Sequence, residues 1–204
     1  MGINGILTVI SGFSGAGKGT IVGELCKKEN YALSISATTR APRKGEEDGR
    51  EYFFKTTDEF VKMISDDGLI EWAQYVGNYY GTPKAYVEEM LAQGKNVILE
   101  IEVQGAMNIK KLYPDAVLMF VTPPSAAILK ERLQGRGTES ADVIEGRLQR
   151  AAEECQYMEH YDYIIINDEL EECVEQIDGI LESYRVRKRE CQKIIDKMTE
   201  ELHA

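Results

Sequence analysis

The sequence predicts an α/β protein with a mostly parallel sheet flanked by helices. Two observations support this class: short apolar runs rich in β-branched residues recur along the 204-residue chain, and a helical pattern follows each of them. Because the runs lack strict alternation, they indicate strands buried on both faces of a parallel sheet. The four runs are Gly5–Ile10, Asn96–Ile101, Ala116–Val121 and Tyr163–Ile166. The helical patterns start after Lys18, at Gln104, at Ser125 and at Glu171.

Composition is ordinary for one globular domain over residues 1–204, with 43% hydrophobic and 29% charged residues. The net charge of -11 argues against binding to nucleic acid or to an anionic membrane. No apolar stretch approaches the ~20 residues of a membrane span, and "MGINGILTVI" lacks the features of a signal peptide. We therefore expect a cytoplasmic protein with no membrane partner, whose four cysteines are reduced thiols. Nothing here predicts an oligomeric state.

The pattern of the chain changes between Ser34 and Gly94, where aromatic, polar and turn-forming residues replace the βα alternation. This change predicts a small lobe at 35–94 inserted between core segments 1–34 and 95–184. A glycine-containing charged stretch, "QGRGTES", indicates a lid at 134–147. The remainder, 185–204, is predicted as a charged C-terminal helix, more simply a solvated helix end than a partner-binding arm.

A phosphate-binding P-loop is indicated by "GFSGAGK", Gly12 to Lys18, which lies between a predicted strand and a predicted helix. In such a loop successive backbone N–H groups and the helix N-terminus converge on an anion. Lys18 can reach the β- and γ-phosphates of a nucleotide. At the next position, where a Ser or Thr hydroxyl normally meets Mg²⁺, the chain has Gly19. Mg²⁺ depends mainly on water and substrate phosphates, so the metal site could be weakened without being lost, with Thr20 acting through water.

A second anion site is indicated by Arg40 and Arg43, three residues apart in a loop that contains proline. Two such guanidinium groups can hold one phosphate, and Tyr52 can donate a further hydrogen bond. Taken alone, a solvated basic loop beside the acidic "GEEDG" is equally plausible.

Carboxylates suited to base recognition follow at Glu71 and at Glu100 and Glu102, which close a predicted strand. A carboxylate accepts two parallel N–H bonds, and guanine presents such a pair at N1 and N2. Adenine would leave a buried carboxylate unpaired, which can give discrimination on the order of 10⁴. The pattern favours a guanine nucleotide as acceptor, although Glu71 alone would be read as a surface residue.

These segments resemble the guanylate kinase family over nearly the whole chain, Gly5 to about Tyr184. The motifs that carry the resemblance are "SISATTRAPRKGEEDGREYFF", "IEWAQYVGNYYGTP", "ILEIEVQGA", "ERLQGRGTES" and "IINDEL". The resemblance implies a P-loop nucleoside monophosphate kinase fold with a small mixed-sheet acceptor-binding lobe and a lid. It also implies Mg²⁺-dependent transfer of the γ-phosphoryl group of ATP to GMP, giving ADP and GDP, in purine metabolism.

The expected site residues fall into four sets. ATP is expected at Gly12, Phe13, Ser14, Gly15, Ala16, Gly17, Lys18, Gly19, Thr20, Asn167 and Asp168. By the resemblance, GMP is expected at Ser36, Arg40, Arg43, Tyr52, Glu71, Tyr80, Thr82 and Glu102. The catalytic cations are expected to be Lys18, Arg132, Arg136 and Arg147, and Mg²⁺ is expected near Glu100 and Thr20, through water.

Three positions depart from the family pattern: Phe13 replaces a usual Pro, Gly19 a usual Ser, and Glu102 a usual Asp. Two alternatives stay open. One is a guanylate kinase-like module that binds peptides without chemistry, which would not need Lys18 or the lid arginines. The other is a P-loop kinase with another acceptor such as AMP, suggested by "GKGT", against which Glu71 and Glu102 argue.

Overall fold

The computed structural model describes residues 5–135, 141–185 and 192–203. Its larger sheet has five parallel strands in the order β2-β7-β1-β8-β9. Their bounds are β1 Leu7–Gly12, β2 Tyr31–Leu33, β7 Asn96–Glu100, β8 Val117–Thr122 and β9 Tyr163–Ile166. Parallel neighbours place the carboxyl ends of β1, β7 and β8 at one edge, where the P-loop begins.

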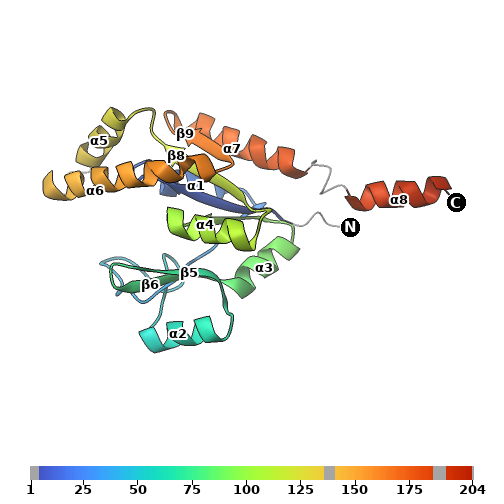
Figure 1. Ribbon diagram of the computed structural model, residues 1–204, viewed down its shortest axis with the longest axis horizontal. Helices are drawn as coiled ribbons and strands as arrows, with labels where there is room; N and C mark the ends of the chain where they lie inside the picture. The colour runs from blue at the N-terminus through green and yellow to red at the C-terminus, as the bar shows by residue number, and fades with distance from the viewer. Residues whose placement is uncertain (1–4, 136–140, 186–191, 204) are drawn as a thin grey trace.

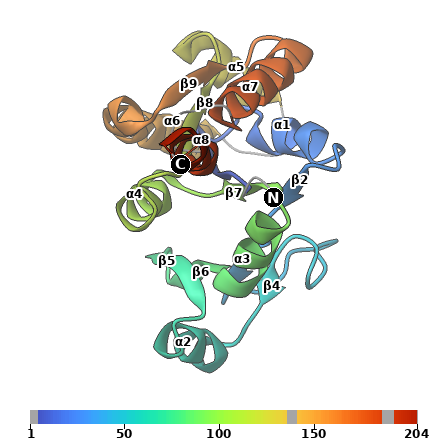
Figure 2. The same ribbon diagram turned by 90° about the vertical axis from the view of Figure 1, so that its right-hand side faces the viewer.

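Helices cover both faces of this sheet (Figures 1 and 2). Helices α1 (Lys18–Leu25) and α7 (Leu170–Arg185) lie on one face, while α4 (Val103–Leu112) and α6 (Ala141–Glu154) lie on the other. Further elements are α3 (Lys84–Ala92), α5 (Ala126–Gly135) and a 3₁₀ helix, η1 (Cys155–His160). The predicted α/β class with a mostly parallel, helix-flanked sheet is confirmed.

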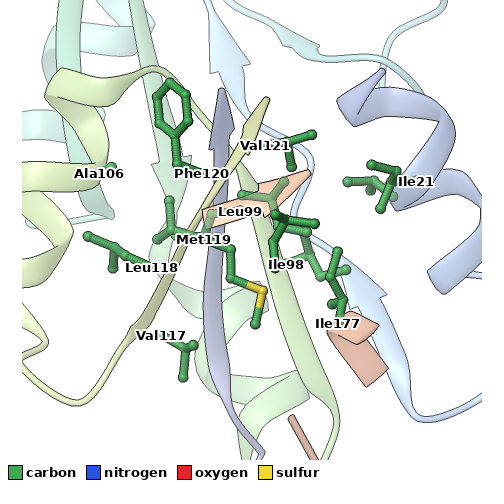
Figure 3. Close-up of a cluster of buried hydrophobic side chains, with 14 of the residues drawn as sticks. Ile21, Ile98, Leu99, Ala106, Val117, Leu118, Met119, Phe120, Val121 and Ile177 are labelled. Atoms are coloured by element: carbon green, nitrogen blue, oxygen red, sulfur yellow. The ribbon is translucent and has the colours of Figure 1, made fainter. Parts of the chain in front are cut away.

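The core lies between the sheet and its helices, and alternate side chains of β8 serve its two faces. Figure 3 shows Leu118 and Phe120 directed toward Ala106 of α4, and Ile21 of α1 and Ile177 of α7 on the opposite side. All five side chains are completely buried. Burial of this kind is worth roughly 1.5–3 kcal/mol for each large apolar side chain. It fixes the strand ends that carry the site.

The smaller sheet is mixed, with the order β4-β3-β6-β5. Strand β3 (Ala37–Thr38) pairs parallel with β4 (Phe53–Phe54) and antiparallel with β6 (Asn78–Pro83), which also pairs antiparallel with β5 (Leu69–Tyr75). Helix α2 (Thr57–Ser65) packs on it through fully buried Phe60, whose ring stacks on Tyr79 at 5.4 Å. The predicted mixed sheet is therefore present.

Two features differ from what the sequence indicates. Strand β9 lies at the edge of the sheet, and its Ile164 and Ile166 are 40% and 57% exposed, so this strand is not buried on both faces. The C-terminal helix, α8, is described over Gln192–His203, and α7 already includes Arg185. Within the described residues, no helix is long and apolar enough to cross a membrane.

Candidate functional site

The P-loop follows β1 and wraps the N-terminus of α1. Gly12, Gly15 and Gly17 all have positive φ, of 148°, 92° and 91°. A Cβ on Gly12 would collide with the backbone carbonyl of Val121, and one on Gly17 with the Asn167 amide nitrogen. Gly17 caps α1 without any side-chain hydrogen bond, so the first N–H groups of the helix are not capped by a side chain. The loop therefore has the backbone that an anion cradle requires.

Two side chains of the P-loop are held in place by the protein. The Lys18 ammonium donates to the carbonyl oxygens of Gly12, at 2.6 Å, and Phe13, at 3.1 Å. Phe13 is buried, with its ring edge-on to Phe120 at a centroid distance of 4.9 Å. This contact gives the aromatic side chain of Phe13 a place in the core.

A cavity of about 340 Å³ opens beside the loop, and we call it the donor cavity. The side-chain amide of Asn167 donates to the backbone carbonyl of Ala16 at 2.7 Å. Arg132 donates to the backbone carbonyl of Asn167 at 2.8 Å. Arg147 of α6 donates to the Ser14 hydroxyl. Helices α5 and α6 thus bring two predicted cations to the nucleotide loop. The donor cavity is lined by Gly15, Gly17, Thr20, Arg132, Gly135, Asn167, Asp168 and Leu170.

One predicted cation, Arg136, lies outside the described residues, as does the middle of the predicted lid, 136–140.

A second cavity, of about 580 Å³, is lined by residues of both sheets, and we call it the acceptor cavity. Seven of the eight predicted GMP residues line it: Ser36, Arg40, Arg43, Tyr52, Glu71, Tyr80 and Glu102. The eighth, Thr82, is buried behind it and donates a 2.8 Å hydrogen bond to Glu71. Lys18 and Glu100 line the same cavity, so it reaches the P-loop.

The basic end of the acceptor cavity is ordered by Glu46, a carboxylate of the acidic "GEEDG" run to which the sequence analysis gave no role. Glu46 accepts two 3.0 Å hydrogen bonds from Arg40, and the pair is only 15% and 17% exposed. Glu46 also accepts from the backbone N–H of Arg43 at 2.7 Å. The Arg40 guanidinium lies over the Tyr52 ring at 5.3 Å. The loop is thus ordered by hydrogen bonds between its acidic and basic residues, whereas the sequence analysis singled out only the basic ones.

Glu71, at the other end, is 7% exposed and supplied by β5. Desolvation raises its pKa to about 7, opposed by the hydrogen bond from Thr82. A Cβ on Gly105 of α4 would lie 3.1 Å from Oε2 of Glu71, so the absence of a side chain there makes room for the carboxylate. Gly105 is a glycine inside a predicted helix, which is a signal for close packing, but the sequence analysis did not use it.

Glu100 ends β7 beside the P-loop. Desolvation raises its pKa, while the positive charge of Lys18 lowers it. A Cβ on Gly19 would lie 3.9 Å from Glu100 Oε1, and Thr20 is next in α1. Among the residues that the structure describes, no group of three or more His, Cys, Asp or Glu side chains could hold a metal alone. One carboxylate and one hydroxyl fit Mg²⁺, which is usually bound by one or two carboxylates together with substrate phosphates.

Comparison with known proteins agrees with this geometry. The family model described as "Guanylate kinase" matches residues 5–184. A guanylate kinase of Bacillus anthracis is 51% identical over 97% of this chain and 98% of its own, and one from Halalkalibacterium halodurans is 48% identical over 95% and 94%. The crystal structure of guanylate kinase from Anaplasma phagocytophilum matches with a TM-score of 0.74 and 33% identity, covering 91% of this chain and 89% of that one. The chain therefore belongs to the guanylate kinase family, and it is a kinase.

Proposed function

We propose that this chain transfers the γ-phosphoryl group of ATP to GMP, giving ADP and GDP, with Mg²⁺, in the purine nucleotide metabolism of the cytoplasm. The observation that carries the proposal is the lining of the acceptor cavity. It contains the P-loop cation Lys18, the Arg40 and Arg43 pair and the buried carboxylate Glu71. A purine monophosphate bound there would lie between a phosphate-binding end, a base-binding end and the donor loop.

At the base-binding end, Glu71 supports selection of guanine over adenine. Its carboxylate would accept N–H bonds from N1 and N2 of guanine, while Thr82 keeps one of its oxygens hydrogen bonded. Adenine has an unprotonated N1 in that position and would leave the buried carboxylate without a donor. Glu102 lines the same cavity, at the start of the helix whose Gly105 lies beside Glu71, and would accept from the exocyclic amine.

At the phosphate-binding end, Arg40, Arg43, Ser36, Tyr52 and Tyr80 would hold the acceptor phosphate. The rings of Tyr52 and Tyr80 lie 6.1 Å apart and form one wall of the cavity. Two guanidinium groups on one phosphate fix its direction as well as its position. Positioning matters most here, because phosphoryl transfer needs little covalent help from a protein.

Around the transferring phosphoryl group, charge neutralisation would come from Lys18, Arg132 and Arg147. Bound Mg²⁺ would add charge neutralisation at the phosphate oxygens, with Glu100 and Thr20 holding it through water. An arginine acting on such a transition state is worth roughly 10³ to 10⁵ in rate. In this proposal the lobe 35–94 binds the acceptor, and it and the segment 134–147 close over the nucleotides and exclude water.

The test is ADP release from ATP and Mg²⁺ with GMP as acceptor, and with AMP in parallel, for the wild type and Lys18→Ala. We expect GMP-dependent turnover that Lys18→Ala abolishes, and little turnover with AMP. Efficient turnover of AMP would identify another acceptor. GMP binding without any turnover would instead support a binding module.

A further inference from the structure

Arg150 lines the acceptor cavity but was not among the residues that the sequence singled out. It lies on α6, three residues after Arg147. Its Nη2 donates to Oε2 of Glu102 at 3.3 Å, and its Nε donates to Oε1 of Glu154 at 3.1 Å. One guanidinium thus joins a carboxylate of the base-binding end to a carboxylate of its own helix.

The charges around Arg150 show why a cation is needed there. Glu154 is 6% exposed, and desolvation raises its pKa; the charge of Glu102 raises it further, whereas Arg150 lowers it. The charge of Glu102 also raises the pKa of Glu100. The charge of Glu102 therefore acts on both Glu100 and Glu154. Arg150 contacts Glu102 and Glu154, and it lowers the pKa of Glu154.

Helix α6 connects the two nucleotide sites through Arg147 and Arg150. Residues three apart lie on the same side of a helix. The first arginine contacts Ser14 of the P-loop, and the second contacts Glu102 of the acceptor cavity. The role proposed for Arg147 is at the phosphoryl group, and Arg150 points to a separate role at the base.

We propose that Arg150 is a positioning residue that fixes the Glu102 carboxylate and so sets the preference for a purine with an amine at C2. The inference rests on the proposed function. Glu102 occupies the N-cap position of α4, but its side chain makes no capping hydrogen bond and is mostly exposed. Its own helix therefore does not hold the carboxylate. The bond to Arg150 uses Oε2, and a carboxylate has a second oxygen to accept from the guanine amine.

The experiment measures binding of GMP and of IMP, which lacks the C2 amine, by calorimetry without ATP. The variants are Arg150→Ala, Arg150→Lys, Glu102→Gln and the double variant Arg150→Ala with Glu102→Gln. We expect Arg150→Ala to weaken GMP binding about tenfold and IMP binding less than twofold, as for loss of a charge-assisted hydrogen bond. Arg150→Lys should recover part of the loss. The double variant should bind GMP no more weakly than Glu102→Gln alone.

Gln149→Ala, at the exposed neighbouring position of α6, is the matched control and should leave both affinities unchanged. Equal losses for GMP and IMP, or fully additive losses in the double variant, would show that Arg150 only supports the fold. Tighter GMP binding in Arg150→Ala would show that Arg150 competes with guanine for Glu102, which also overturns the proposal. If Arg150→Ala does not fold, Arg150→Lys and Glu102→Gln still give the comparison of GMP with IMP.

The two proposals fail separately. A wild-type protein that neither binds nor phosphorylates GMP defeats the proposed function. Wild-type turnover of GMP, together with unchanged GMP affinity in Arg150→Ala, defeats only the role of Arg150.

Discussion

The Thr82 hydroxyl donates a 2.8 Å hydrogen bond to Oε1 of Glu71, in the buried wall where β5 and β6 meet α4. This single donor only partly offsets the desolvation of the carboxylate, so the pKa of Glu71 lies at about 7. Near neutral pH the group is therefore divided between its two protonation states. In the proposed site guanine would need the ionised form, because a protonated carboxyl loses acceptor capacity and gains a donor.

We therefore predict that GMP binding expels a proton from Glu71. Below pH 7 the bound complex holds fewer protons than the free protein, so GMP affinity should rise with pH and level off above about pH 8. Calorimetry at pH 6 in two buffers of different ionisation enthalpy gives the number of protons released. Glu71→Gln is the control, since it leaves the titration of the GMP phosphate in place; identical proton release in both proteins would contradict the prediction.

The same group should make folding stability depend on pH. In the unfolded chain Glu71 ionises near its ordinary pKa of 4.5, whereas in the folded protein it keeps its proton to about 7. Unfolding in this window releases a proton, so rising pH favours the unfolded state. Relative to Glu71→Gln, the wild-type free energy of unfolding should fall between about pH 4.5 and 7, by at most on the order of 3 kcal/mol. Urea denaturation of both proteins across this range measures it, and a constant difference would refute it.

The sequence predicted most of what depends on local pattern. Apolar runs indicated the parallel strands, and the glycine spacing indicated a loop in which Gly12, Gly15 and Gly17 adopt positive φ. The order of the strands in the sheet could not be predicted from the sequence, because an apolar run does not reveal how many neighbours a strand has. That is why the exposure of Ile164 and Ile166 on the edge strand β9 was not foreseen.

The site residues that sequence analysis missed act through long-range contacts or close packing. Arg150 of α6 meets Glu102, at the start of α4, only in the folded chain, and no periodicity connects positions 48 residues apart. Glu46 stands in an acidic run that is normally solvated, yet it is largely buried against Arg40. Gly105 is explained only by its approach to Glu71. Each needs the tertiary arrangement, which composition and spacing do not encode.

Gly17→Ala should damage the P-loop itself. The new methyl would be held at φ 91° and would collide with the Asn167 amide, breaking the hydrogen bond from Asn167 to Ala16. We expect a loss of about 1–3 kcal/mol in unfolding free energy and weaker ATP binding. Gly23→Ala, inside α1, is the matched control, because nothing lies within 4 Å of its added Cβ. It should raise the free energy of unfolding by up to about 1 kcal/mol. Equal effects of the two changes on thermal unfolding would contradict this account.

Arg147→Ala should lower kcat far more than it raises the KM for ATP. The Arg147 side chain meets the P-loop at the Ser14 hydroxyl. In the proposed site the backbone of the loop would make the main contribution to phosphate binding. If Arg147 neutralises charge that develops during transfer, its loss reduces the rate by about 10³ or more. Steady-state kinetics with GMP separate the two constants. A large rise in KM with kcat unchanged would instead make Arg147 a ground-state ATP contact.

Gly19→Ser tests whether the P-loop can regain a metal ligand. The Cβ would lie 3.9 Å from Glu100 Oε1, so a Ser hydroxyl would stand beside the carboxylate that we propose holds Mg²⁺. We expect Ser to lower severalfold the free Mg²⁺ concentration that gives half-maximal turnover, and to tighten Mn²⁺ binding to the ADP complex. Gly19→Ala is the control, because it adds the same Cβ and gains the same helix propensity without an oxygen. If Ala and Ser shift the metal dependence equally, the effect comes from the backbone of α1 and not from coordination. If neither shifts it, the metal is held by phosphates, water and Glu100 alone, and the missing hydroxyl is no handicap to this enzyme.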